Sequence, residues 1–381
     1  MGPLKGIKVL ELGGIGPGPF TSMLLSDMGA QVIRIERIVA SDSGVKGMDV
    51  RFNLLNRGRP SVAMDLKNPK AVEAIKRMLV NADALVEGFR PGVAERLGLG
   101  PADCLAVNPR LAYGRITGWG QDGPLANATG HDLNYIALTG ALHSIGLKDG
   151  PPVPPLNLVG DFGGGAMFLA FGLVCAILES RSSGRGQVVD AAMVDGSAAL
   201  MGLIYGMRAG GHWSDERGSN RLDSGTPWYA VYETLDGKYV SVASNELRFY
   251  KDMILAMGLD KEDLPDRDDP SGWPRLRQRF AEVFKQKTRD EWCEIMKDSD
   301  ACFAPVLSLA EAPQHPHLKA RNTFVEMDGI VQPAPAPRFS RTKPELRRGS
   351  PSEGQYDVGA LAEWGLNDAD VKALRAAGAL A

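Results

Sequence analysis

Short apolar strands alternate with helices through the first half of this chain, and no other feature constrains its fold as strongly. Asn68 and Pro69 are a favoured N-cap and first-turn residue for one of these helices. Such an alternation predicts an α/β fold in which a parallel sheet carries helices on its faces. The expected elements are strands over residues 7–12, 32–35, 84–86 and 111–116 and helices over residues 70–80 and 167–179.

The pattern changes after about residue 210, where a smaller α+β unit is expected. Asp236 and Gly237 separate two strand-like runs and are typical of a hairpin turn, whose central residues need positive φ. Thr288 and Glu291 form a capping-box pattern ahead of a helix. Residues 332–337 (QPAPAP) predict a stiff, extended connector. We therefore predict a large domain over residues 1–190, a helical linker over 191–225, a small α+β domain over 226–315 and a final segment over 316–381.

Charge and cysteine content argue against several classes of protein. The net charge of -3 and the pI near 6.0 give no general field that attracts nucleic acid, so an anionic ligand must meet a local basic cluster. The four cysteines show no CxxC spacing, which indicates free thiols in a reducing compartment. The sequence shows no leader-like start and no uninterrupted apolar run of about 18 residues. We expect a cytoplasmic enzyme without a membrane partner.

The first turn, residues 13–18 (GGIGPG), follows a strand and precedes a helix. One interpretation is a dinucleotide-binding turn, with Glu36 at the end of the second strand binding a ribose hydroxyl. The glycine spacing is not G-x-G-x-x-G, and Pro17 and Pro19 lack the N–H groups that would hold a pyrophosphate. The other interpretation is a tight connection that needs glycine for its backbone.

Basic side chains gather after the predicted strands. They are either a solvated rim or, as a set, a site for a ligand with several phosphates, for which arginine is well suited. Ligands of open α/β sheets bind at the carboxyl ends of the strands, where this set is expected to lie. The set comprises Arg34, Arg37, Arg57, Arg59, Lys67, Arg90 and Arg96.

His131 and Asp161 are candidates for acid–base chemistry, since an imidazole and a carboxyl are the groups best suited to move protons near neutral pH. Each also has a structural interpretation: His131 stands at a helix start, and aspartate is a preferred N-cap. The glycines at 163–165 could let backbone N–H groups approach an oxyanion. The remaining histidines show no convincing metal-ligand spacing.

The chain resembles the class III CoA-transferase superfamily and, within it, the α-methylacyl-CoA racemases. The GHD-x-NY block at residues 130–135 indicates the racemases rather than the transferases. The resemblance extends over nearly the whole length. It is carried by residues 9–12 (VLEL), 16–20 (GPGPF), 56–59 (NRGR), 64–67 (MDLK), 87–92 (EGFRPG), 117–121 (TGWGQ), 130–135 (GHDLNY), 155–161 (PLNLVGD), 186–190 (GQVVD) and 300–302 (DAC).

The resemblance implies a Rossmann-like large domain, completed by the returning C-terminal segment, and a smaller α+β domain. It also implies a homodimer of interlocked subunits that binds an acyl-CoA substrate and needs no cofactor and no metal. The residues that it implies for CoA binding are Arg37, Asp65, Leu66, Lys67, Gly88, Phe89, Arg90, Arg96, Gly130, Asp132, Asn134 and Tyr135.

For catalysis, the resemblance implies His131 and Asp161 as the two acid/base groups, with Glu246 beside the histidine. In the (S) to (R) direction neutral His131 would be the base and protonated Asp161 the acid. Two blocks depart from the racemase pattern, at residues 224–227 (SGTP) and 247–248 (LR), and both concern acyl preference. The alternative is a CoA-transferase in which Asp161 forms an acyl anhydride and His131 has no required role. A non-catalytic nucleotide-binding module and an NAD-dependent dehydrogenase are further alternatives.

Overall fold

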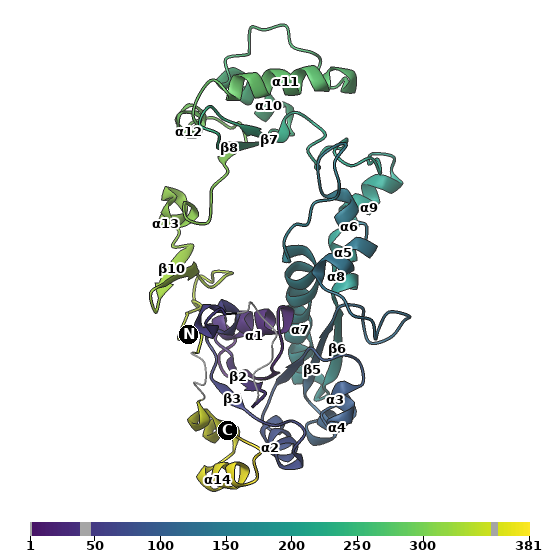
Figure 1. Cartoon of the computed structure of the whole chain (residues 1–381), viewed down its shortest axis with the longest axis vertical. Coiled ribbons are helices and arrows are strands. Elements are labelled where there is room, and N and C mark those ends of the chain that lie inside the picture. The colour runs from purple at the N-terminus through teal and green to yellow at the C-terminus, as the bar shows by residue number, and fades with distance from the viewer. Residues whose placement is uncertain (1, 39–46, 352–356) are drawn as a thin grey trace. The chain divides into compact units, whose positions relative to one another are not determined.

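The computed structural model describes residues 2–38, 47–351 and 357–381, and its helices and strands are labelled in Figure 1. The chain forms two compact units. The first comprises Met1–Thr139, Leu156–Met201 and Asn322–Ala381, and the second comprises Gly140–Pro155 and Gly202–Arg321. The predicted small domain covered residues 226–315. The second unit also includes residues 140–155, because Arg217 donates hydrogen bonds to the carbonyl oxygens of His143 (2.8 Å) and Gly150.

The first unit is built on a six-stranded sheet in which all paired strands run parallel. The strand order is β3-β2-β1-β4-β5-β6, which is the order of the doubly wound Rossmann fold. The α/β class and the parallel sheet predicted from the sequence are confirmed. The strands are β1 (Lys8–Leu12), β2 (Gln31–Glu36), β3 (Ser61–Ala63), β4 (Ala84–Glu87), β5 (Ala112–Thr117) and β6 (Gln187–Ala192).

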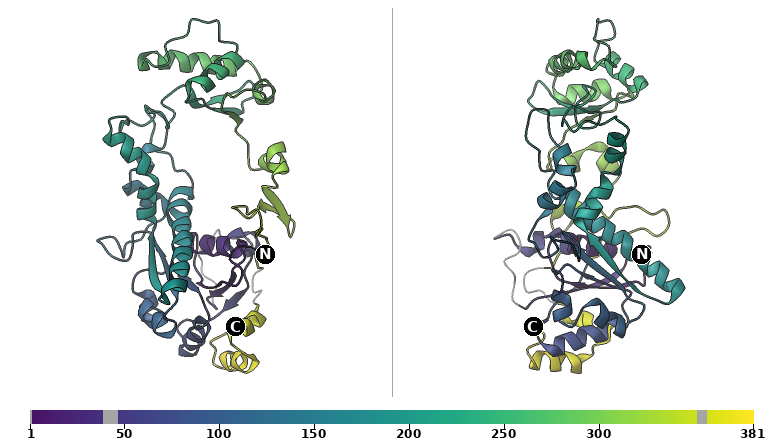
Figure 2. Two further views of the ribbon diagram at one scale, coloured as in Figure 1. Left: turned by 180° about the vertical axis from the view of Figure 1, so that it is seen from behind. Right: turned by 90° about the vertical axis from the view of Figure 1, so that its right-hand side faces the viewer.

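Helices cover both faces of this sheet. Leu10 and Leu12 of β1 pack on one face with Ile75, whereas Val9, the residue before Leu10, packs on the other face with Leu169. This alternation follows from the two-residue repeat of a strand. In the right-hand view of Figure 2 the purple α1 and the yellow α14 lie on opposite sides of the sheet. The helices of this unit are α1 (Pro17–Asp27), α2 (Pro69–Leu79), α3 (Val93–Arg96), α4 (Pro101–Val107), α5 (Asp132–Leu138), a π-helical segment (Leu158–Ala166), α7 (Met167–Ser183), α8 (Met193–Leu200) and α14 (Asp368–Ala376).

The C-terminal segment returns to the first unit. Trp364 and Leu374 are buried in the core that also contains α2, and the Asn68 side chain donates to the carbonyl of Ala377 (2.8 Å). The segment also includes the hairpin β10 (Phe324–Met327) and β11 (Ile330–Pro333). Gln332 is therefore in a strand, with its side chain buried against Arg57 (2.9 Å), so the expected connector over 332–337 is wrong at its start.

The second unit has a three-stranded antiparallel sheet, β7 (Tyr229–Glu233), β8 (Tyr239–Ala243) and β9 (Phe303–Pro305). The predicted hairpin is confirmed, with Gly237 at φ +73°. Asp236 is not among the described residues with positive φ, so the expectation of positive φ at both turn residues is wrong. The capping box of Thr288 and Glu291 is confirmed. The other helices are α6 (Ala141–Ser144), α9 (Gly202–Ala209), α10 (Leu247–Ala256), α11 (Trp273–Phe284), α12 (Arg289–Met296) and α13 (Pro316–Ala320).

Candidate active site

The strand order of the first unit reverses between β1 and β4, and the loops after these strands form the crevice where doubly wound folds bind ligands. Asp161 lies at this place. A Cβ atom added to Gly16, in the loop after β1, would be 3.3 Å from Oδ2 of Asp161. Phe162 stacks on Phe20 of α1, with 4.5 Å between ring centroids. The carboxyl of Asp161 is therefore held at the switch point of the sheet.

The loop after β1 needs glycine at two positions because of its backbone geometry. Gly13 donates its N–H to the carbonyl of Ile35 (2.7 Å), and a Cβ there would lie 2.8 Å from that oxygen. Gly16 has φ +65° and precedes Pro17, which begins α1. These contacts support the interpretation of the turn as a tight connection.

His131 lies beside Asp161, although thirty residues separate them in the chain. The backbone N–H of Asp161 donates to Oδ2 of Asp132, the residue after His131, over 2.7 Å. His131 is the N-cap of α5 and is exposed, and its N–H donates to Oδ1 of Asn134 (3.0 Å). The two predicted acid–base groups are therefore neighbours in the structure, and the helix-start interpretation of His131 is compatible with a chemical role.

The pKa of the Asp161 carboxyl is raised above its usual range, mainly because the side chain is partly buried. The nearby Asp132 carboxylate also raises this pKa by repulsion, whereas a hydrogen bond from Asn157 (3.3 Å) and the charge of His131 lower it. A carboxyl with a raised pKa is able to keep a proton for transfer to a substrate. Asn157 was missed as a site residue, because only the fold brings its amide to Asp161.

The segment around Asp161 is π-helical, and its glycines are required by packing. A Cβ on Gly164 would lie 2.5 Å from Oγ of Ser197, and one on Gly196 of α8 would lie 1.8 Å from the carbonyl oxygen of Gly164. Asp161 lies inside this segment and is not an N-cap of α7. The N–H of Asp161 is already donated to Asp132, so it is not available to an oxyanion.

The predicted basic cluster divides into two groups. Arg37, Lys67, Arg90 and Arg96 are exposed and follow β2, β3 and β4; among the described residues their side chains form no hydrogen bond or ion pair. These four side chains are therefore exposed at the carboxyl edge of the sheet, where an anionic ligand could meet them.

Three arginines of the predicted cluster are buried and engaged. Arg34 and Arg59 pair with the fully buried Glu11, the latter over 3.1 Å, and Arg57 pairs with Asp27 (2.6 Å). The expectation that these three arginines meet phosphate is therefore wrong, because their charges are used inside the fold.

The other residues implied for CoA binding lie in the same unit, in two places. Asp65, Leu66, Gly88 and Phe89 follow β3 and β4, where the side chains of Leu66 and Phe89 pack on the core. Gly130, Asp132, Asn134 and Tyr135 surround His131.

Among the residues implied for CoA binding, Asp132 and Tyr135 have buried side chains. Asp132 is 6% exposed and Tyr135 is 7% exposed. The ring of Tyr135 occupies the space beside Gly118, and its hydroxyl donates to the carbonyl of Gly130, with burial raising its pKa to about 12. Their side chains therefore support the His131 turn from within.

Glu246 belongs to the second unit, where it is the N-cap of α10. The carbonyl of the preceding Asn245 accepts a hydrogen bond from Arg267. The guanidinium of Arg267 lies over the rings of Trp228 (4.5 Å) and Tyr250 (4.8 Å). The backbone before Glu246 is thus held by an arginine packed between aromatic rings.

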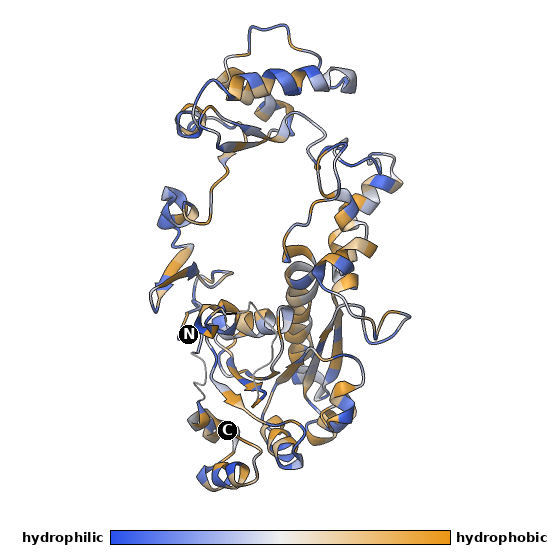
Figure 3. Cartoon of the chain, in the orientation of Figure 1, coloured by the Kyte–Doolittle hydropathy of each residue, from blue (hydrophilic) through white to orange (hydrophobic). Residues whose placement is uncertain are grey.

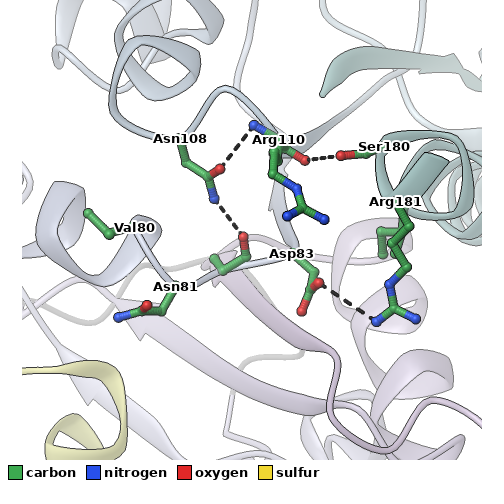
Figure 4. Close-up of a pocket in the computed structure, with 9 residues that line it drawn as sticks. Val80, Asn81, Asp83, Asn108, Arg110, Ser180 and Arg181 are labelled. Carbon is green, nitrogen blue, oxygen red and sulfur yellow. Dashed lines mark hydrogen bonds and ion pairs between the residues drawn. The ribbon is translucent and has the colours of Figure 1, made fainter. Parts of the chain in front are cut away.

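A cavity of about 220 Å³ lies at the opposite edge of the sheet, and Figure 4 shows the residues that line it. Asp83 precedes β4, and Asn108 and Arg110 precede β5, so this cavity lies at the amino ends of the strands. Its polar groups satisfy one another: Ser180 donates to the carbonyl of Arg110 (2.8 Å), and Asn108 donates to that of Ala82 (2.8 Å). It is therefore not the candidate active site. No cluster of three or more possible metal ligands occurs within residues 2–38, 47–351 and 357–381.

Comparisons with known proteins agree on one family. A model of CoA-transferase family III matches residues 4–357. The chain is 42% identical to an α-methylacyl-CoA racemase of Mus musculus, over 97% of this chain and 95% of that protein, and 39% identical to that of Homo sapiens with the same coverage. The solved structure of a CAIB/BAIF family protein from Brucella suis has a TM-score of 0.81 at 25% identity, covering 95% of this chain and 99% of that one.

Proposed function

This chain belongs to CoA-transferase family III, and we propose that it is an isomerase, an α-methylacyl-CoA racemase that interconverts (R)- and (S)-2-methylacyl-CoA thioesters. The observation that carries the proposal is that His131 and Asp161 are neighbours at the switch point of the sheet. The pKa of the Asp161 carboxyl is also raised, as an acid needs. The full-length similarity to racemases at 39–42% identity supports the same activity.

The proposed reaction is a 1,1-proton transfer. A thioester carbonyl acidifies the neighbouring C–H bond, because the carbanion spreads onto oxygen as an enolate. In the (S) to (R) direction neutral His131 takes the α-proton, the electron pair of that bond enters the enolate, and protonated Asp161 returns a proton to the opposite face. The reverse reaction exchanges the two roles. No electrons are gained or lost overall, so we propose that no cofactor takes part.

The CoA portion is proposed to bind along the carboxyl edge of the sheet. The exposed side chains of Arg37, Lys67, Arg90 and Arg96 supply positive charge for its phosphates. Glu246 is proposed as a further catalytic residue that assists His131. We also propose a cytoplasmic location for the enzyme, in keeping with its four free cysteines, and no nucleic-acid partner.

Incubation of a 2-methylacyl-CoA in heavy water, without any acceptor acid, tests the proposed function. A racemase exchanges the α-proton for deuterium and epimerises the thioester. A CoA-transferase does neither until a carboxylate acceptor is added, and then it forms a new thioester through an Asp161 anhydride. Acceptor-dependent product without α-exchange would replace the racemase proposal by the transferase alternative.

We further propose that the enzyme is a homodimer of interlocked subunits, since α7 has an exposed apolar face that the described part of the chain does not cover. Met167, Phe171, Val174 and Leu178 recur on one side of this helix, and Phe171 and Leu178 are 72% and 69% exposed. Figure 3 shows the apolar character of α7. A face of this kind is typical of a protein–protein interface.

The alternative to a second copy of the chain is that a membrane contacts the apolar face of α7. Residues Leu158–Ser183 are long and apolar enough to cross one, by length and composition alone. The opposite side of α7 packs on the sheet through Leu169 and Leu173, and Asp161 interrupts the segment. We therefore favour a second copy of the chain.

Phe171→Asp is expected to convert the dimer to a monomer, because it places a charge within the apolar face. Sedimentation velocity checks the mass. Val80→Asp, at an exposed apolar residue (57%) next to α2, is the matched control and should stay dimeric. A monomeric wild-type protein that floats with lipid vesicles would refute the dimer and favour the membrane.

A further inference from the structure

Asp132 adjoins both proposed acid–base groups, yet its side chain is withdrawn from solvent. It follows His131 directly and is 6% exposed. Its Oδ2 accepts the N–H of Asp161 over 2.7 Å, while its Oδ1 is buried without a hydrogen-bond partner among the described residues. A buried carboxylate oxygen without a donor is costly, so its place beside the site needs a physical reason.

The contact between Asp132 and the Asp161 segment is close and specific. A Cβ on Gly160 would lie 2.5 Å from Oδ2 of Asp132, so the residue before Asp161 has to be glycine for the hydrogen bond to form. The bond joins the first turn of α5 to the π-helical segment. It therefore fixes the backbone from which the Asp161 carboxyl projects.

We infer that the buried carboxylate of Asp132 is a positioning group, which fixes the backbone of Asp161 and favours the protonated form of its carboxyl. This inference rests on the proposed racemase activity, in which Asp161 must hold a proton in one direction of the reaction. Asp132 would thus act through Asp161, without contact with the substrate.

Among the residues that the structure describes, few charged groups act on the carboxyl of Asp161. The loop before α5 contributes His131, and α5 itself contributes Asp132 and the neutral phenol of Tyr135. The segment before the π-helix contributes the neutral amide of Asn157, and the loop before α1 contributes Gly16.

Of these neighbours, Asp132 is the carboxylate that raises the pKa of Asp161 by repulsion, in addition to the larger effect of burial. On α8, Asp195 interacts with Asp190 instead. Removing the charge of Asp132 should therefore lower the pKa of Asp161.

The test compares Asp132→Asn, Asp132→Ala and wild type in the deuterium-exchange assay over a range of pH, in both directions. Asp132→Asn keeps an oxygen that can accept the Asp161 N–H and removes only the charge. In the direction that needs protonated Asp161, the rate falls as pH rises through the pKa of Asp161, and this limb should move to lower pH. In the reverse direction Asp161 must be ionised, so the rising limb should move to lower pH as well.

Asp132→Ala also removes the hydrogen bond, and kcat at the optimum should fall about tenfold or more with KM nearly unchanged. Asp83→Asn is the matched control, since Asp83 likewise accepts a backbone N–H, from Lys8 over 2.8 Å, at the opposite edge of the sheet. Its pH profile should equal that of wild type.

A second readout does not depend on turnover. In protein with ¹³C-labelled aspartate carboxyls, the Asp161 resonance, identified by its loss in Asp161→Asn, should titrate at lower pH in Asp132→Asn than in wild type. An unchanged Asp161 titration and unchanged limbs would overturn the inference. A wild-type enzyme without α-proton exchange would instead refute the proposed function, and the NMR titration would still decide the role of Asp132.

Discussion

Replacing His131 with alanine is expected to lower kcat by about 10²–10⁴-fold, the usual contribution of a positioned acid or base. His131 is the exposed N-cap of α5, and its backbone N–H is held by Asn134 independently of the imidazole, so the turn should survive the change. Thioester binding should persist, because Arg37, Lys67 and Arg90 remain. Deuterium exchange at saturating substrate measures the first effect, and calorimetric titration with the thioester measures the second.

His317→Ala is a suitable control, because His317 is an exposed histidine on α13 and should leave kcat unchanged. An unchanged rate in His131→Ala would remove the histidine from the mechanism and support the transferase alternative. A loss of binding as large as the loss of turnover would show that His131 holds the substrate instead.

Glu11→Gln is expected to lower the free energy of unfolding by about 3–5 kcal/mol, the usual cost of breaking a buried ion pair on one side. Glu11 is fully buried at the end of β1 between Arg34 and Arg59. Arg59 is itself 1% exposed, and burial lowers its pKa to about 10. Without Glu11 this guanidinium would keep a charge in the interior with poor compensation.

Urea denaturation checks this stability prediction. Asp103→Asn, which breaks the more exposed pair with Lys76 (3.3 Å), is the control and should cost only about 0–1 kcal/mol. A loss for Glu11→Gln as small as that of the control would show that the buried network does not hold the fold. Arg59 also donates to the carbonyl of Pro19 in α1 (2.8 Å), so the same variant should loosen the loop that faces Asp161.

Signals that act within a few residues could be predicted from the sequence. Asn68 caps α2, and the Asp236-Gly237 turn joins β7 to β8, because each depends on backbone geometry close by in the chain. Strand β3, of three residues, and strand β6, in which half of the residues are exposed, lack the apolar pattern that predicts a strand. They become strands through pairing with β2 and β5.

The candidate site was predictable as residue types but not as an arrangement. His131 and Asp161 were identified by their chemistry and by resemblance, and the fold brings them together. The engagement of Arg57 with Asp27 and Gln332 could not be predicted, because these partners lie 30 and 275 residues away in the chain. That the side chain of Asp132 is buried could not be predicted either, because its hydrogen-bond partner is the backbone N–H of Asp161, in a distant segment.

The π-helical segment, with its wider i→i+5 turns, has a consequence for how this site could change during evolution. Such turns hold more residues than α-helical ones, so the direction in which Asp161 points depends on the exact number of residues between 158 and 166. Loss of a single residue would let the segment continue α7 as an ordinary helix and rotate the carboxyl away from the imidazole, while the sheet beneath remained intact. In relatives that keep the architecture, the length of this short stretch should therefore indicate whether the carboxyl has kept its place at the switch point.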